Sequence, residues 1–219
     1  NDIRRDVEIR WCILEDLEMK CRFCNTELAQ LVVDLGTSPI SNAFLEEASL
    51  DKKEPFYPLR VYVCHECFLV QLDDNTQPPE EFFSKYLYFS SYSTTWLKHA
   101  KDLADEIIEK FDCDQNTNVI EIASNDGYLL QHFKDNNIPG LGIEPAANVA
   151  KIAEERGIKT VNKFFGINTA NDLKESGNQA DILLAINVLP HVPDLHDFLK
   201  GIKVILKSDG ILIIQFSTY

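Results

Sequence analysis

The second half of the sequence alternates apolar runs of strand length with segments of helical periodicity, and this alternation restricts the possible fold most. The runs with the composition of buried strands are VIEIA (119–123), GLGIEP (140–145), a weaker KTVNKFF (159–165), ADILLAINVL (180–189) and GILIIQF (210–216). The segments with helical spacing are YLLQHFKD, AANVAKIAEERG and PDLHDFLKGIKVIL. Strands that alternate with helices form a doubly wound, mostly parallel sheet. The sequence therefore predicts an α/β domain of about five strands over residues 114–219.

A linker region precedes this domain. Residues 81–93, EFFSKYLYFSSYS, are dense in aromatic residues and serines. A helix follows, because apolar residues then recur at 3.6-residue spacing; they are Leu97, Ala100, Leu103, Ala104, Ile107, Ile108 and Phe111. Thr94 or Thr95 is the expected N-cap. We therefore expect residues 81–113 to form an aromatic segment followed by a linker helix.

Two CxxC pairs bracket a loop-rich module over residues 19–80. Cys21 and Cys24 stand in KCRFC, and Cys64 and Cys67 stand in VCHEC, with 39 residues between the pairs. Four thiolates arranged in this way suit tetrahedral zinc. Two disulfides or a redox pair are the alternative, but disulfides are rare in a cytoplasmic chain. Because cysteine fills all four positions, we expect a structural zinc ion and no zinc catalysis.

Charge and composition exclude several classes of partner. The chain has 219 residues, and its formal net charge of −14 argues against a nucleic-acid surface and against an anionic membrane surface. No run of residues approaches the roughly 20 apolar residues of a membrane span. Residues 1–18 are charged throughout, lack an apolar signal core and are interpreted as an N-terminal extension. We therefore expect a cytoplasmic protein.

The loop after the first predicted strand carries a modified glycine pattern. The strand-end pattern acidic-x-Gly-x-Gly-x-Gly aligns with Glu121, Ala123, Asn125 and Gly127. Alanine is small enough for a close backbone approach, and asparagine tolerates positive φ better than most residues. Glu144 ends the second strand, where an acidic residue typically binds ribose hydroxyls.

The acidic residues of this loop favour one cofactor class. Asp126 would repel the pyrophosphate of a dinucleotide, whereas the sulfonium of S-adenosylmethionine (SAM) is a cation that Glu121 would also attract. SAM is therefore the favoured ligand. A dinucleotide and a turn without a ligand remain alternatives.

Four stretches of the sequence together resemble the sugar C-methyltransferases. They are EIASNDGYLLQHF, GIEPAANVA, NVLPHVPDLHDF and, between the cysteine pairs, DLGTSPISNAFL. These enzymes of deoxysugar biosynthesis have an N-terminal zinc-binding domain, a Rossmann-like class I methyltransferase domain and a C-terminal domain. The resemblance covers the chain from Met19 to its end. It implies SAM-dependent methylation of a nucleotide-linked 4-keto-6-deoxy sugar, commonly at C3 through an enolate.

The resemblance also implies roles for individual residues. Glu121, Ala123, Ser124, Asn125 and Gly127 would line the SAM loop, and Glu144 and Pro145 would lie at the ribose. Phe164 and Phe165 would flank the adenine, Asn187 would face the methionine end, and His191, Tyr86 and Tyr88 would lie in the catalytic region. Each role has a structural alternative. The two phenylalanines could be core residues, Asn187 could cap a turn, His191 could cap the next helix, and the tyrosine segment could be a linker packed on the sheet.

The sequence departs from the family at its end. It stops at QFSTY, just after the fifth predicted strand, whereas the family adds two further strands, a catalytic histidine and the C-terminal domain. We therefore expect a zinc site and much of a SAM site in a truncated chain that lacks part of the active site and is a monomer or weak oligomer. The alternative functions are methylation of another small molecule and a binding scaffold without catalysis.

Overall fold

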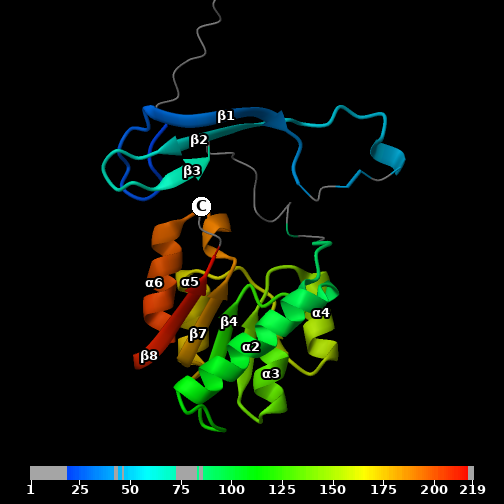
Figure 1. The fold of residues 1–219 in the computed structure, drawn as a ribbon, viewed down its shortest axis with the longest axis vertical. Coiled ribbons are helices and arrows are strands. Elements are labelled where there is room, and N and C mark those ends of the chain that lie inside the picture. Colours follow the sequence, from blue (N-terminus) through cyan, green and yellow to red (C-terminus); the bar gives the residue numbers. More distant parts are fainter. Residues whose placement is uncertain (1–18, 42–43, 46, 73–82, 84–85, 217–219) are drawn as a thin grey trace, which may run out of the picture. The chain divides into compact units, whose positions relative to one another are not determined.

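The computed structural model describes residues 19–41, 44–45, 47–72, 83 and 86–216. The chain divides into two compact units (Figure 1). One unit comprises Asn1–Ser38 and Tyr57–Asn75, and the other comprises Pro39–Phe56 and Thr76–Tyr219. Among the described residues, no helix is long and apolar enough to cross a membrane.

The first unit is a small antiparallel sheet beside a cysteine cluster. Its strands are β1 (Gln30–Ser38), β2 (Tyr57–Val63) and β3 (Val70–Leu72), in the order β1-β2-β3. Among the described residues, its buried hydrophobic residues are few: Cys21, Leu28, Tyr62 and Cys64. A core of this size supplies little hydrophobic stabilisation, so small units of this kind usually need a metal or disulfides.

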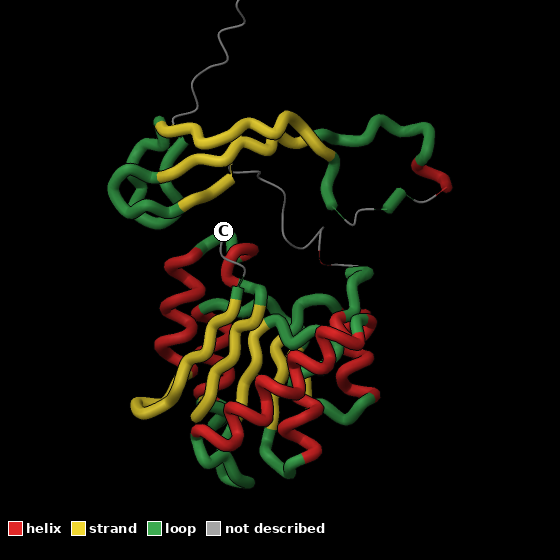
Figure 2. Tube along the Cα trace, viewed as in Figure 1, coloured by secondary structure: helices red, strands yellow, loops and turns green. Residues whose placement is uncertain are grey.

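The second unit is a parallel sheet with helices on both faces (Figure 2). Its elements are α2 (Thr94–Lys110), β4 (Val119–Ile122), α3 (Leu130–Asp135), β5 (Gly140–Ile143), α4 (Ala147–Glu155), β6 (Lys159–Val161), α5 (Ile167–Glu175), β7 (Ala180–Ile186), α6 (Leu195–Ile205) and β8 (Leu206–Gln215). The strand order is β6-β5-β4-β7-β8, so the strand order reverses between β4 and β7. Ligands of open α/β sheets bind at such a reversal, beyond the carboxyl ends of the strands.

Helices α2, α3 and α4 pack on one face of the sheet. One core cluster joins Ala100, Ala104 and Ile107 of α2 to residues of α3, α4, β4 and β7. Helices α5 and α6 pack against each other, and Figure 1 shows them on the other face. The predicted α/β class with five parallel strands is therefore confirmed.

Several local predictions differ from the structure; the third predicted strand, for example, ends at Val161 and not at Phe165. Ser93, and not Thr94 or Thr95, caps α2, and its hydroxyl accepts a bond from the backbone N–H of Trp96 at 3.2 Å. Helix α5 was not predicted. Strand β8 begins at Leu206, four residues before the predicted start.

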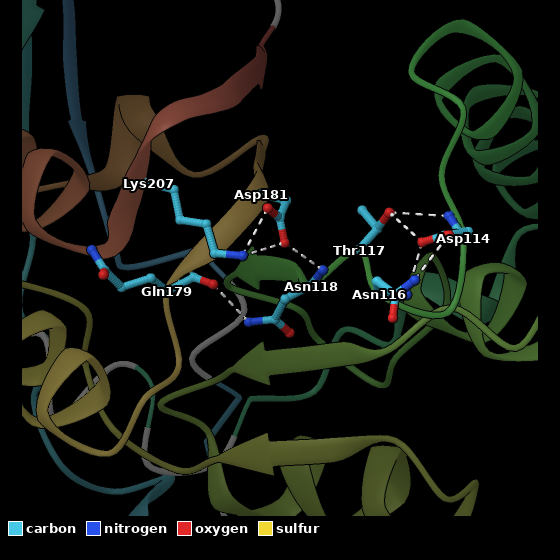
Figure 3. Close-up of polar contacts among 7 residues, drawn as sticks. All are labelled: Asp114, Asn116, Thr117, Asn118, Gln179, Asp181 and Lys207. Carbon is cyan, nitrogen blue, oxygen red and sulfur yellow. Dashed lines mark hydrogen bonds and ion pairs between the residues drawn. The ribbon is translucent and has the colours of Figure 1, made fainter.

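A polar network aligns the amino-terminal ends of the central strands (Figure 3). Asp181 accepts a bond from the backbone N–H of Asn118 at 2.8 Å and pairs with Lys207 at 2.8 Å. The amide of Asn118 also donates to the backbone carbonyl of Gln179 at 2.9 Å. Because these residues precede or begin β4, β7 and β8, the network holds these strands in register at the edge opposite the loop after β4.

Candidate functional site

The four cysteines form a compact sulfur cluster. Their Sγ atoms all lie within 4.8 Å of one another, with Cys21–Cys67 at 3.6 Å and Cys24–Cys64 at 3.4 Å. Sulfurs about 2.3 Å from a tetrahedral zinc ion are about 3.8 Å apart. The donor set and its spacing therefore fit zinc, and the four thiolates would complete its coordination.

The two CxxC segments have the same local fold. The backbone N–H of Asn25 donates to the carbonyl of Cys21 at 2.8 Å, and that of Phe68 donates to Cys64 at 2.9 Å. Asn25 and Phe68 both have positive φ, 60° and 61°. This turn directs both sulfurs of each pair to one side, as the CxxC spacing predicts.

Gln71 supports the first cysteine pair from β3. It is buried, its amide donates to Cys21 Sγ at 3.3 Å, and its carbonyl oxygen accepts from the backbone N–H of Arg22 at 3.1 Å. Burial opposes ionisation of Cys21, but bonds from the Cys24 backbone and from Gln71 lower the pKa of this thiol to about 6. Hydrogen bonds of this kind orient ligands and favour the thiolate that a metal needs. The sequence offered no pattern that would single out Gln71.

The loop after β4 has positive φ at each of the three positions where the pattern carries glycine. The angles are 57° at Ala123, 49° at Asn125 and 76° at Gly127. Asparagine adopts this region readily, whereas alanine pays a steric cost there. A Cβ on Gly127 would lie 2.9 Å from Ile158 Cγ1, so this glycine also permits close packing. The loop keeps the glycine backbone path although two glycines are replaced.

Glu144 ties this loop to the end of β5. Its Oε2 accepts from the backbone N–H of Asn125 at 2.9 Å, and its Oε1 accepts from that of Ala146 at 2.8 Å. Burial raises the pKa of this carboxyl, although the two backbone bonds oppose the shift. Asn162 donates to the carbonyls of Glu144 and Pro145, both at 2.8 Å, and thereby holds the chain after β5. Sequence reasoning missed Asn162, whose partners lie 17 and 18 residues earlier.

A cavity of about 270 Å³ opens beside this loop, at the carboxyl ends of the strands. The predicted site residues that line it are Tyr86, Tyr88, Ala123, Asn125, Glu144, Pro145, Phe164, Phe165, Asn187 and His191. Glu121, Ser124 and Gly127 are not among its lining residues. Glu121 and Ser124 are fully buried. The fold thus brings ten residues from well-separated parts of the sequence to one cavity.

Glu121 and Asp126 are buried acidic groups close to the cavity. Among the residues that the structure describes, neither carboxylate oxygen of Glu121 has a hydrogen-bond partner. Burial, followed by the charges of Glu144 and Asp126, raises the pKa of Glu121 well above its usual value. The Asp126 side chain is fully buried, pairs with Arg156 at 3.1 Å and does not line the cavity. The expected repulsion of a pyrophosphate by Asp126 would therefore act from beneath the cavity wall. Its partner Arg156 lies 30 residues away, so this pairing could not be predicted from the sequence.

Aromatic side chains form much of the cavity wall. Trp96 and Tyr128 lie with ring centroids 6.0 Å apart, and Phe165 packs against Phe198 at 5.3 Å. Phe83 meets Phe164 at 6.0 Å. Of these six aromatic residues, only Phe164 and Phe165 were predicted; Phe83, Trp96, Tyr128 and Phe198 were missed. Trp96 and Phe198 lie in predicted helices, but helical spacing does not separate residues of a cavity wall from residues of the core.

The last two predicted residues follow β7. Asn187 has φ 54°, and its backbone N–H donates to the carbonyl of Gln215 at 2.7 Å. His191 ends a short 3-10 helix, Leu189–His191, and is exposed at the cavity. Asp194 caps α6 by accepting from the backbone N–H of Asp197, so His191 does not cap that helix.

Two family models match consecutive parts of the chain. Residues 96–219, more than half of the chain, match a model described as "Methyltransferase domain". The chain belongs to this methyltransferase family. Residues 21–83 match a model described as "Putative zinc binding domain". These matches confirm the predicted class I, SAM-binding methyltransferase fold and the zinc-binding domain before it.

Two curated relatives are named methyltransferases, and one solved structure is similar in fold. The C-methyltransferase NovU of Streptomyces niveus is 27% identical over 90% of this chain and 46% of its own length. The ubiquinone biosynthesis O-methyltransferase of Azorhizobium caulinodans is 24% identical over 44% of this chain and 39% of its own length. The PH0226 protein from Pyrococcus horikoshii OT3 is a structural neighbour, with a TM-score of 0.47, 14% identity, and coverage of 65% of this chain and 63% of its own. This methyltransferase chain spans less than half the length of the curated relatives that it matches.

Proposed function

We propose that this methyltransferase chain binds SAM in the cavity and takes part in C-methylation of a nucleotide-linked 4-keto-6-deoxy sugar. The observation that carries the cofactor assignment is Glu144, a buried carboxylate at the cavity whose two oxygens accept bonds from Asn125 in the loop after β4 and from Ala146 just before α4. Each oxygen keeps a second lone pair for a ribose hydroxyl. The C-methyltransferase relative, similar over 90% of the chain, supports the reaction type.

The residues proposed to serve the cofactor either line the cavity or lie behind its wall. Glu144 and Pro145 would hold the ribose, the faces of Phe164 and Phe165 would cover the adenine, and Asn187 would face the methionine end. Ala123 and Asn125 bring the loop backbone to the ligand. Glu121, Ser124 and Gly127 do not line the cavity and would help to fix the backbone path of the loop after β4. When bound, SAM supplies an electrophilic methyl group on a sulfonium.

His191, Tyr86 and Tyr88 are the proposed acid–base groups. All three line the same cavity. The imidazole of His191 can accept the proton that must leave C3 of the sugar. A tyrosine hydroxyl can donate to the enolate oxygen that forms. Burial, followed by the charge of Glu144, raises the pKa of Tyr86, which keeps this group protonated as a donor.

Cofactor binding is tested by calorimetry with S-adenosylhomocysteine on the zinc-loaded protein. Glu144→Ala should weaken binding by about tenfold or more, since charge-assisted bonds contribute roughly 1.5–3 kcal/mol each. Glu154→Ala, an exposed glutamate on α4, is the matched control. No binding by the folded wild-type protein would reject an enzymatic function and leave a binding scaffold.

The reaction type is tested by isotope exchange. In deuterium oxide, with S-adenosylhomocysteine bound, a C3-methyltransferase should exchange the C3 proton of a nucleotide-linked 4-keto-6-deoxy sugar. His191→Asn should slow this exchange. Absence of exchange, together with methylation of a hydroxyl group, would favour O-methylation instead.

A further inference from the structure

The residues before α2 form a segment that follows the cofactor loop closely. We define the strap as residues 86–92 and the cofactor loop as residues 123–127. Tyr86, Tyr88 and Ser90 of the strap line the cavity, and the Tyr86 and Tyr88 rings lie 6.4 Å apart. The position of the strap therefore sets where the two tyrosines stand in the cavity.

Asn125 bonds the strap to the cofactor loop. Its Oδ1 accepts from the backbone N–H of Ser90 at 2.8 Å, and its Nδ2 donates to the carbonyl of Tyr88 at 3.2 Å. An asparagine amide offers both an acceptor and a donor, so one side chain satisfies two backbone groups of the strap. A glycine at this position of the loop could make neither bond.

Asn148 repeats this arrangement from the first turn of α4. Its Nδ2 donates to the carbonyl of Tyr86 at 2.7 Å, and its Oδ1 accepts from the backbone N–H of Tyr86 at 3.3 Å. Asn148 is exposed and does not line the cavity. Among the residues that the structure describes, its side-chain hydrogen bonds reach the cavity through Tyr86.

A third connection follows at the end of the strap. The Ser91 hydroxyl donates to Asp126 of the cofactor loop and accepts from Arg156 at 3.1 Å. Arg156 also donates to the backbone carbonyl of Asp126 at 2.9 Å. Three successive points of the strap are thus bonded to the cofactor loop or to α4.

We propose that Asn148 is a positioning residue for the methyl acceptor, because it holds Tyr86 in the cavity while Asn125 holds the adjacent part of the strap. The acceptor role rests on the function proposed above, whereas the anchoring of the strap does not. Loss of Asn148 removes both side-chain bonds to the Tyr86 backbone. The cofactor loop keeps its bond from Asn125 to Glu144, so cofactor affinity depends on Asn148 far less than acceptor affinity does.

The anchoring is tested first, in the ligand-free protein, by NMR-detected amide hydrogen exchange. Asn148→Ala removes both bonds to Tyr86, and exchange of the Tyr86 amide should accelerate about tenfold. Asn168→Ala is the matched control, because Asn168 is the exposed second residue of α5 as Asn148 is of α4. Alanine is a strong helix former, so neither change weakens its helix. Equal exchange in wild type and Asn148→Ala would overturn the anchoring.

The positioning role is tested by steady-state kinetics and calorimetry. In Asn148→Ala, the KM for the sugar acceptor should rise about tenfold, while the Kd for S-adenosylhomocysteine stays within about twofold. Asn125→Ala should weaken both. Faster exchange of the strap with unchanged acceptor kinetics would refute the positioning role. If the wild-type protein does not bind the cofactor, the proposed function is refuted, but the amide hydrogen exchange still tests the anchoring of the strap.

Discussion

Replacing Gly142 by alanine should push the cofactor loop out of place. Gly142 lies in β5, paired with Glu121 of β4, and its missing side chain leaves space for Ser124. A Cβ at this position would lie 2.3 Å from Ser124 Oγ and 2.9 Å from Ser124 Cβ. Rotation of the hydroxyl would relieve the first contact only. Because Ser124 is fully buried, the loop backbone itself must move.

The expected cost follows from the size of this overlap. Ordinary contact begins at 3.4 Å, so after rotation of the hydroxyl the Cβ still lies about 0.5 Å too close to Ser124 Cβ, and overpacking of this kind costs about 1–3 kcal/mol. We expect Gly142→Ala to lose about 2–3 kcal/mol of unfolding free energy and to weaken binding of S-adenosylhomocysteine. Gly140→Ala in the same strand is the control, since its Cβ would meet only the flexible end of Leu130 at 3.3 Å.

A double-mutant cycle tests the cause. Ser124→Gly removes the side chain that the new Cβ would strike, so the double variant should be more stable than the sum of the single changes by about 1–2 kcal/mol. Urea unfolding with zinc held constant measures each free energy. Additivity within about 0.5 kcal/mol would show that the two positions do not meet, and the steric reasoning would fail.

Three further predictions concern buried charge and the metal. Burial raises the pKa of Glu121, so the folded state retains a proton that the unfolded state releases above about pH 4.3, and stability falls as the pH rises. Glu121→Gln should therefore stabilise the protein increasingly above that pH, by at most about 1.4 kcal/mol per pH unit; equal pH profiles of unfolding free energy would contradict this. Arg156→Met leaves the buried Asp126 without its cation and should lower the free energy of unfolding by about 2–3 kcal/mol. This loss is smaller than for a fully buried pair because the arginine is partly exposed. In urea unfolding, a loss below about 0.5 kcal/mol would argue against a structural role for the pair. Metal analysis should find one zinc per chain, and its removal by a chelator should unfold the first unit. Gln71→Leu should speed zinc loss because it removes the bond to Cys21. A first unit that keeps its circular dichroism without metal would refute the structural role of zinc.

The local predictions succeeded where the pattern was strong. The apolar runs that begin at Val119, Gly140 and Ala180 became β4, β5 and β7, because a strand buried on both faces needs a continuous apolar run. Helix α5 was missed because its buried residues are only Thr169, Ala170 and Leu173, too few for a clear stripe. Ser93 could not be distinguished as the cap of α2 from the threonines that follow it, since all three side chains can accept the capping bond.

Residues of the cavity could be predicted where they belong to a short sequence pattern, as in the loop after the first strand. Glu144 could be placed near the loop because it ends the second predicted strand, and it lines the cavity; its binding of ribose stays a prediction. Asn125 was correctly expected to adopt positive φ, but its side-chain bonds to the strap were not foreseen. Trp96 and Tyr128 were missed because a helical pattern records which residues are buried and does not record which of them border a cavity.

The sequence by itself determined the two kinds of structure in this protein, since cysteine spacing specifies a metal knuckle and apolar periodicity specifies a strand or a helix. The backbone path of the cofactor loop was also readable, because few residue types tolerate its dihedral angles. Only the tertiary structure decided which way the side chains of β4 and of the cofactor loop point. Asp126 turns to Arg156, Asn125 turns to the strap, and Glu121 is sealed beneath. The orientations of Asp126 and Asn125 depend on partners 30 or more residues away, which come close only when the sheet has assembled.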